Sequence, residues 1–265
     1  MTRKSLAAMM ILACVAPAAA PPAARSEETP QSVHAKPDEK SPVKFSYQTR
    51  KIEGWTVHIS DTLLARQKDA TDNALKILEQ HLVAIVRDVP AGPVAKIRGV
   101  QLWLSPEYRG VRPTAEYHPD EGWLRRTGRN PAMAKGVEFT DIKDFEAETR
   151  RMPCFVLHEL AHAYHDQVLG FDQPEIIAAY KRAVESKSYD AVERTFGDPK
   201  RPNTIERAYA MTNEKEYFSE STEAYFGRND FFPFTREELR KHDPKMCELL
   251  GRLWEIPAEA QGATP

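Results

Sequence analysis

The sequence predicts an α+β fold, with a small mixed β-sheet in the first half of the chain and helices in the second half. Two observations support this prediction. Short segments of alternating apolar and polar residues lie before residue 143, and the segments that follow place apolar residues at helical spacing. The chain has 265 residues, of which 41% are hydrophobic, which is enough for a buried core in one domain.

The alternating segments predict four strands, which cover residues 43–47, 55–59, 97–104 and 136–142. A turn at Gly54 joins the first two. Residues 61–89 carry apolar side chains on one stripe, which predicts a single long helix. Asp61 is its expected cap, and the Pro90–Pro93 segment ends it.

Residues 106–131 are rich in proline, glycine, arginine and aromatic residues and follow no regular pattern. A connection of this length is often functional. It is expected to be either a binding loop, in which Tyr108, Tyr117 and Trp123 contact an extended peptide, or a surface loop without such a role.

The N-terminus has the layout of a secretory signal peptide. Arg3 and Lys4 precede an apolar run, Leu6 to Val15, and small residues follow it. Cleavage after Ala18 is expected, which predicts export to a periplasmic or extracellular location. Two alternatives stay open. The leader is retained, or Cys14, in a segment similar to a lipobox, becomes the lipidated first residue of a lipoprotein.

These features divide the chain into a signal peptide at 1–18, a disordered leader at 19–42, one domain at 43–256 and a flexible tail at 257–265. The N-terminal apolar run is too short to span about 30 Å of hydrocarbon, so no transmembrane segment is expected. Lys and Arg total 37 against 39 Asp and Glu, so charge does not indicate a nucleic-acid partner.

Two cysteines, Cys154 and Cys247, remain after the expected cleavage of the signal peptide. In an exported protein they could form one disulfide. A buried free cysteine is an equally reasonable interpretation, because Cys154 lies in an apolar run.

The chemistry is predicted by the pattern H-E-x-x-H at His158, Glu159 and His162, inside an apolar helical run. On a helix the two histidines lie one turn apart on one face, so both imidazoles can bind one metal ion. Glu159 lies beside them and can take a proton from a water that zinc acidifies, then pass it to a leaving amine. The alternative, two core or solvated histidines, explains the apolar context poorly.

A catalytic zinc usually has three protein ligands, so a third is needed. The extended motif of the metzincins is absent, because His165 stands at its glycine position and Val168 at its third histidine. His165 lies two turns from His158 and is expected either near the ligands or the substrate, or on the surface. The best donor segment is 213–226, where three carboxylates share one helical face: Glu216, Glu220 and Glu223. Spacing alone does not choose among them.

These two motifs together resemble the zincin peptidases of the gluzincin type. They are most similar to the lethal-factor-like group, whose second motif is an acidic residue, two aromatics, a small residue and the ligand glutamate. The segment 154–234 also resembles exported metallopeptidase-like proteins of unassigned substrate. The resemblance implies a zincin-like fold with an active-site helix, the zinc ligands His158, His162 and Glu220, and Glu159 as general base.

The family's transition-state tyrosine lies several residues before the ligand glutamate. Here the matched position is Asn213, a departure from the pattern, and Tyr209 is the nearest upstream tyrosine. Glu223 is expected to hydrogen-bond a ligand histidine, as zinc-bound imidazoles usually require.

The sequence therefore predicts an exported metallopeptidase that binds one Zn²⁺ per chain and hydrolyses a peptide or protein substrate. The alternative is a zinc-binding module of the same fold that binds peptide with little or no turnover. A third interpretation is hydrolysis of another amide, for example in cell-wall material.

Overall fold

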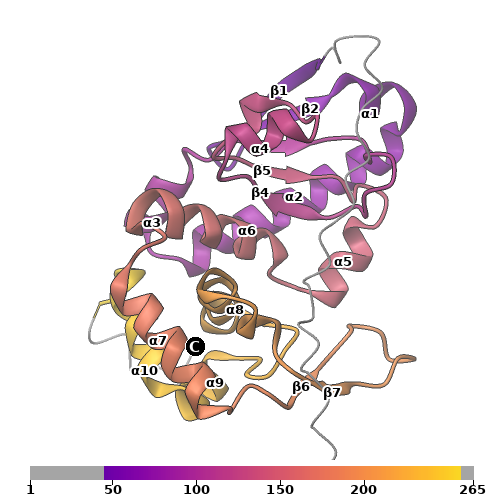
Figure 1. Cartoon of the computed structure of the whole chain (residues 1–265). Coiled ribbons are helices and arrows are strands. Elements are labelled where there is room, and N and C mark those ends of the chain that lie inside the picture. Colours follow the sequence, from indigo (N-terminus) through magenta and orange to yellow (C-terminus); the bar gives the residue numbers. More distant parts are fainter. Residues whose placement is uncertain (1–44, 258–265) are drawn as a thin grey trace, which may run out of the picture. The chain divides into compact units, whose positions relative to one another are not determined.

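The computed structural model describes residues 45–257, which Figure 1 shows in colour. The predicted signal peptide at 1–18 and leader at 19–42 lie outside these residues, as does the predicted tail beyond residue 257. The described part has an α+β fold with a small mixed sheet, which confirms the predicted α+β class.

The sheet has five short strands, β1 Tyr47–Ile52, β2 Trp55–Ser60, β3 Leu102–Leu104, β4 Ala115–Tyr117 and β5 Val137–Phe139. Their order in space is β1-β2-β3-β5-β4. The central strands β2, β3 and β5 run parallel, while β1 and β4 pair antiparallel with their neighbours. Strand β4 therefore forms one edge of the sheet.

The helices that accompany the sheet are α1 Asp61–Arg66, α2 Lys68–Asp88, α3 Ala91–Ile97, α4 Glu121–Arg126, α5 Phe145–Arg151 and α6 Phe155–Tyr164. The helices of the second half are α7 Pro174–Ser186, α8 Glu214–Phe226, α9 Arg236–His242 and α10 Pro244–Leu253. Shorter elements are 3-10 turns at Pro131–Met133 and Tyr209–Met211, a π-helical turn at His165–Leu169, and a hairpin of β6 Val192–Arg194 and β7 Thr204–Glu206.

The predicted helix at 61–89 is two helices, α1 and α2. The chain leaves helical geometry at Gln67, whose φ and ψ are −140° and 38°, and the N-cap of α1 is Ser60 instead of Asp61. The Ser60 hydroxyl accepts a hydrogen bond from the backbone N–H of Thr62.

Three predicted strands differ in extent from the observed ones. β1 covers Tyr47–Ile52 where 43–47 was predicted, and β5 covers only Val137–Phe139 of the predicted 136–142. β3 is confined to Leu102–Leu104 because Ile97 closes the short helix α3. The segment 106–131 is also more regular than expected, since it contains β4 and α4. Strands of three residues are too short for periodicity to locate reliably.

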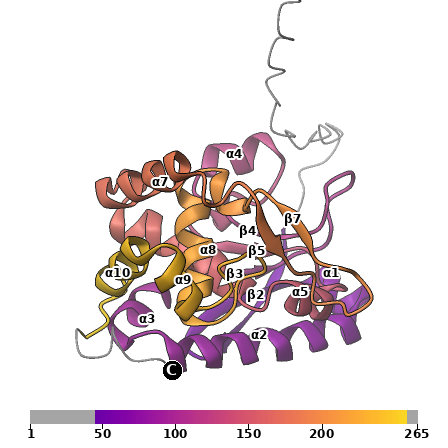
Figure 2. The ribbon, with the colours of Figure 1, turned by 90° about the horizontal axis from the view of Figure 1, so that it is seen from below.

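Helix α6 lies between the sheet and α8 (Figure 1). It packs against β4 and β5 on one side, against α2 and α3, and most extensively against α8. Figure 2 shows the ribbon from below, with the long helix α2 extended beside the sheet. The buried residues of these elements form one continuous hydrophobic core, so α6 has a fixed place at its centre.

Cys154 and Cys247 are both free thiols, so they do not form the disulfide that the sequence left open. Within residues 45–257, no helix combines the length and apolar character needed to cross a bilayer.

Candidate metal centre

The motif histidines are carried by α6, as the sequence predicts. His158 and His162 are separated by one helical turn, and their ring centroids lie 4.7 Å apart. Every residue of α6 except His162 is buried. Packing on every side but that of His162 fixes the helix and so holds both imidazoles in place. His162 lies on the side that stays open.

A carboxylate from α8 meets these rings. Asn213 caps α8, and its side chain accepts hydrogen bonds from the backbone N–H groups of Lys215 and Glu216. This cap fixes where the helix begins and therefore places Glu216 in its first turn, against α6. The positive end of the helix dipole also favours a carboxylate there.

Three potential ligand atoms converge. Glu216 Oε2 lies 3.1 Å from His158 Nε2 and 3.2 Å from His162 Nε2, and the two nitrogens lie 3.1 Å apart. The ligand atoms of a tetrahedral zinc site with bonds of about 2.0–2.1 Å are separated by roughly 3.3 Å. The three residues can therefore hold one metal ion without large movement.

The protonation of these atoms also favours a cation. Glu223 Oε1 lies 2.8 Å from His158 Nδ1, so in the neutral ring Nδ1 carries the proton and donates a hydrogen bond to the carboxylate, which leaves a lone pair on Nε2. That lone pair faces the Glu216 carboxylate and another imidazole nitrogen. Electron-rich atoms at such short distances need a positive charge between them, either a proton or a metal ion.

The pKa values reflect this concentration of negative charge. Burial would lower the pKa of His158, but its contacts with Glu216 and Glu223 outweigh burial and raise the pKa well above its ordinary value. Burial would raise the pKa of Glu216, but hydrogen bonds with His158 and His162 bring it below its ordinary value. The donor set of two imidazoles and one carboxylate suits zinc.

Glu220, the predicted third ligand, does not join this group. It lies one turn further along α8 and is 2% exposed, with Oε2 accepting a hydrogen bond from Asn229 Nδ2 at 3.0 Å. Burial and the neighbouring carboxylates of Glu223 and Asp230 raise its pKa well above the ordinary value. Glu220 instead belongs to a second group of possible ligand atoms, with His158 and Glu223, which does not include His162.

Glu223 lies where the sequence predicts, on the Nδ1 side of His158. It is fully buried, and its second oxygen has no hydrogen-bond partner among the described residues. A buried carboxylate fixes the orientation of the ring and its tautomer.

Glu159 projects toward the edge of the sheet. Its Oε2 accepts a hydrogen bond of 2.8 Å from the backbone N–H of Tyr117 in β4. Burial raises the pKa of the Glu159 carboxyl, although the neighbouring histidines oppose this change. A carboxylate with a raised pKa, anchored through one oxygen, is suited to accept and return a proton.

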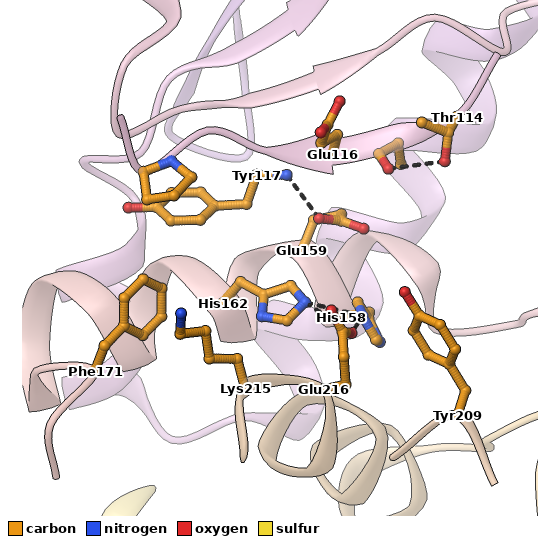
Figure 3. A pocket seen from close by; sticks show the side chains of 12 residues that line it. Thr114, Glu116, Tyr117, His158, Glu159, His162, Phe171, Tyr209, Lys215 and Glu216 are labelled. Atoms are coloured by element: carbon orange, nitrogen blue, oxygen red, sulfur yellow. Dashed lines mark hydrogen bonds and ion pairs between the residues drawn. The ribbon is translucent and has the colours of Figure 1, made fainter. Parts of the chain in front are cut away.

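A cavity of about 360 Å³ opens in front of these groups (Figure 3). Its walls come from β4 and the residues beside it, from α6, from the first turn of α8, and from two single side chains, Phe171 and Tyr209. His158, Glu159, His162 and Glu216 all line it, so the candidate metal centre is open to a ligand.

Tyr209 lies in the 3-10 turn before α8, and its side chain points into the cavity (Figure 3). Burial and the charge of Glu216 raise its pKa to about 12, so the phenol keeps its proton at neutral pH and can donate a hydrogen bond. Asn213 precedes Glu220 by seven residues, and Tyr209 precedes Glu216 by the same number. If Glu216 is the ligand, Tyr209 stands at the position where the resemblance implies a tyrosine.

The remaining candidates lie away from the cavity. His165 is fully buried against Phe171 and Phe218, and within residues 45–257 its ring nitrogens have no hydrogen-bond partner. It therefore makes no hydrogen bond to the candidate ligands and does not line the cavity. The helix continues into the π-helical turn, which directs this side chain into the core.

Of the three aromatics in the 106–131 segment, only Tyr117 lines the cavity. The rings of Tyr108 and Trp123 each lie 4.8 Å from the guanidinium carbon of Arg129, which does not line the cavity. Sequence reasoning missed the contribution of the β4 backbone and of Lys215 and Phe171 to the cavity wall.

Comparison of the chain with family models, with curated proteins and with solved structures finds no match. The geometry of the candidate metal centre is therefore the basis for a functional assignment.

Proposed function

We propose that this protein is a zinc-dependent peptidase with a zincin-like active site, in which His158, His162 and Glu216 hold one Zn²⁺. The observation that carries this proposal is the convergence of three ligand atoms within 3.2 Å of one another beside a buried carboxylate, at the wall of a cavity. Bound zinc supplies Lewis acidity, which acidifies water and polarises a carbonyl group.

The protein side chains supply the proton transfers. Glu159 accepts a proton from the attacking water and delivers it to the leaving amine, and the Tyr117 N–H keeps the carboxylate oriented during both steps. Tyr209 donates a hydrogen bond from its phenol to the oxygen that gains negative charge in the transition state. Glu223 keeps His158 in the tautomer that presents Nε2.

Strand β4 supports a peptide as the substrate. Thr114 and His118, at the two ends of β4, form backbone hydrogen bonds on the β5 side of the strand, Thr114 with Thr140 and His118 with Lys135 and Gly136. The alternate residues Ala115 and Tyr117 therefore direct their peptide groups to the other side, toward the cavity that both line. The Tyr117 N–H already donates to Glu159, so an extended peptide can add to this edge through the remaining backbone groups of Ala115 and Tyr117.

A zinc-binding module without turnover is the alternative that the sequence leaves open. Its main support was the absence of a tyrosine at the matched position. Because Tyr209 stands at that spacing from Glu216 and lines the cavity, this support is lost.

The signal-peptide layout of the N-terminus leads us to propose export as well, with a mature chain beginning after Ala18. The mass of the native protein tests this part, since a lipidated Cys14 or a retained leader would each give a different value.

The decisive experiment compares Glu159→Gln with His162→Ala in zinc content and in cleavage of an unbiased peptide library. Glu159→Gln should keep its zinc and lose cleavage by on the order of hundredfold or more, because Glu159 moves protons but does not bind the metal. His162→Ala should lose both. Wild-type protein that holds one zinc and cleaves no peptide would favour the binding module, and cleavage at the wild-type rate by Glu159→Gln would refute the mechanism.

A further inference from the structure

One charged side chain of the cavity wall has no part in the metal centre. Lys215 lies in the first turn of α8, directly before Glu216, and its ammonium nitrogen is 4.5 Å from the ring centroid of Phe171. Phe171 in turn packs against the hydrophobic core. The ring therefore holds the half-buried lysine at one end of the cavity (Figure 3).

The carboxylates that line the same cavity already have partners. Glu116 pairs with Arg129 at 2.7 Å, and Glu159 accepts the hydrogen bond of the Tyr117 N–H. Glu216 faces the two histidines. The charges of these acids are thus engaged within the protein.

Lys215 differs from them. Within residues 45–257, no carboxylate or carbonyl oxygen accepts a hydrogen bond from its ammonium group, and no other lysine or arginine lines the cavity. A cation held at the wall of a cleft attracts an anionic group of a ligand. Because the aromatic contact already restricts the side chain, less rotamer entropy is lost when it binds that group.

We propose that Lys215 makes this site selective for peptides with an acidic side chain, Asp or Glu, close to the bond that is cleaved. This inference rests on the proposed peptidase function, which names a peptide as the ligand. The ammonium group donates charge-assisted hydrogen bonds to the side-chain carboxylate of the peptide.

The direction of β4 places this acidic residue on one side of the scissile bond. The Thr114 end of the strand lies toward Tyr209, and its Tyr117 end lies toward Phe171 and Lys215 (Figure 3). Antiparallel pairing is the slightly more stable arrangement, and a peptide that pairs antiparallel with β4 runs from the Phe171 end toward the Tyr209 end, so its residues N-terminal to the scissile bond lie beside Lys215. The acidic residue is therefore on the N-terminal side.

Binding can be measured without turnover in a zinc-loaded Glu159→Gln background. The probes are end-blocked, fluorescein-labelled decapeptide libraries that fix Glu or Gln at one position in turn. We expect the Glu library to bind about fivefold more tightly than the Gln library at one position, a difference typical of a partly exposed charge pair. Adding Lys215→Met should reduce this ratio to about one, and Lys215→Glu should invert it.

Lys181→Met is the matched control, because Lys181 is an exposed lysine on α7 outside the cavity. It should keep both the zinc and the fivefold ratio. Each Lys215 variant must have the zinc content and the circular dichroism spectrum of the Glu159→Gln protein. A variant that merely unfolds would bind both libraries weakly, so an inverted ratio of Glu-library to Gln-library affinity in Lys215→Glu cannot come from loss of folding.

Cleavage of the same libraries by the wild-type enzyme then locates the preferred acidic residue relative to the scissile bond. Equal binding of Glu and Gln libraries at every position, or a preference that survives Lys215→Met, would overturn the inference. So would an acidic preference confined to the C-terminal side of the cleaved bond. If the wild type cleaves nothing but binding depends on Lys215 as described, peptidase activity fails and acidic-peptide recognition stands.

Discussion

Helices α6 and α8 cross at the candidate metal centre, and each presents several ionisable side chains to it. On α6 the two proposed ligands and the proposed proton-transfer residue are fixed by the helix itself, since His158 and His162 are four residues apart on one element. On α8, Glu216, Glu220 and Glu223 share one face, and only Glu216 meets both histidines. Spacing identifies ligands within one helix, but the choice on a second helix depends on how the two helices cross.

The difference follows from the way each helix is held. Asn213 begins α8 at a defined residue and places Glu216 at the first turn, where the cavity opens. One and two turns later, α8 is already inside the core, so Glu220 and Glu223 are buried behind the metal centre. Similar carboxylates thus lie in three different environments.

The strongest test of this comparison exchanges each carboxylate for its amide. Glu216→Gln should weaken zinc binding more than about hundredfold, because it removes a charged ligand. Residues that only orient a ligand cost at most about hundredfold in metal affinity when they are replaced, so a larger loss identifies Glu216 as a ligand. Glu220→Gln should leave zinc binding within about threefold of wild type, since Glu220 contacts Asn229 and not the histidine nitrogens that face the cavity. Titration with a competing chelator measures both.

A larger loss in Glu220→Gln than in Glu216→Gln would reverse the assignment and restore the ligand set that the sequence resemblance implies. Glu214→Gln is a control for the loss of charge alone, because Glu214 lies in the same turn of α8 but does not line the cavity.

The next test concerns Tyr209, whose role depends on Glu216 being the ligand. Tyr209→Phe should lower kcat on the order of hundredfold, the scale for removing one donor that stabilises an oxyanion. Its zinc content and its binding of uncleaved peptide in the Glu159→Gln background should stay close to wild type. Tyr180→Phe serves as a control, since its hydroxyl bonds the backbone of Met211 outside the cavity. An unchanged kcat in Tyr209→Phe would remove this residue from the mechanism.

The smallest expected effect is that of Glu223, which acts through His158. Glu223→Gln should weaken zinc binding about tenfold, the lower end of the range for groups that orient a metal ligand. The amide can still accept the proton of His158 Nδ1, so the geometry is kept while the negative charge is lost. If the chelator titration shows no change, the carboxylate does not tune the histidine.

The sequence predicted the parts of the molecule that depend on local pattern. The α+β class, the strands around β2 and β5, and the placement of His158, Glu159 and His162 on one helix follow from periodicity and from a five-residue motif. The break between α1 and α2 at Gln67 was missed, because the apolar stripe continues through both helices.

Features that depend on tertiary arrangement could not be predicted from local sequence patterns. The backbone N–H of Tyr117 reaches Glu159 only because β4 pairs with β5, and strand pairing is not visible in a run of three residues. The choice of Glu216 did leave a signal, the seven-residue separation from Tyr209. That signal gains meaning only when the ligand and the tyrosine are considered together.

The central claim is that one metal ion is held jointly by His158, His162 and Glu216. Crystals of the wild-type protein, grown without added metal and measured on both sides of the zinc absorption edge, test it most directly. We expect a single anomalous peak at about 2.0–2.1 Å from the Nε2 atoms of the two histidines and from a carboxylate oxygen of Glu216. A peak bound by Glu220 in place of Glu216, or no peak even after zinc is added to the crystals, would contradict it.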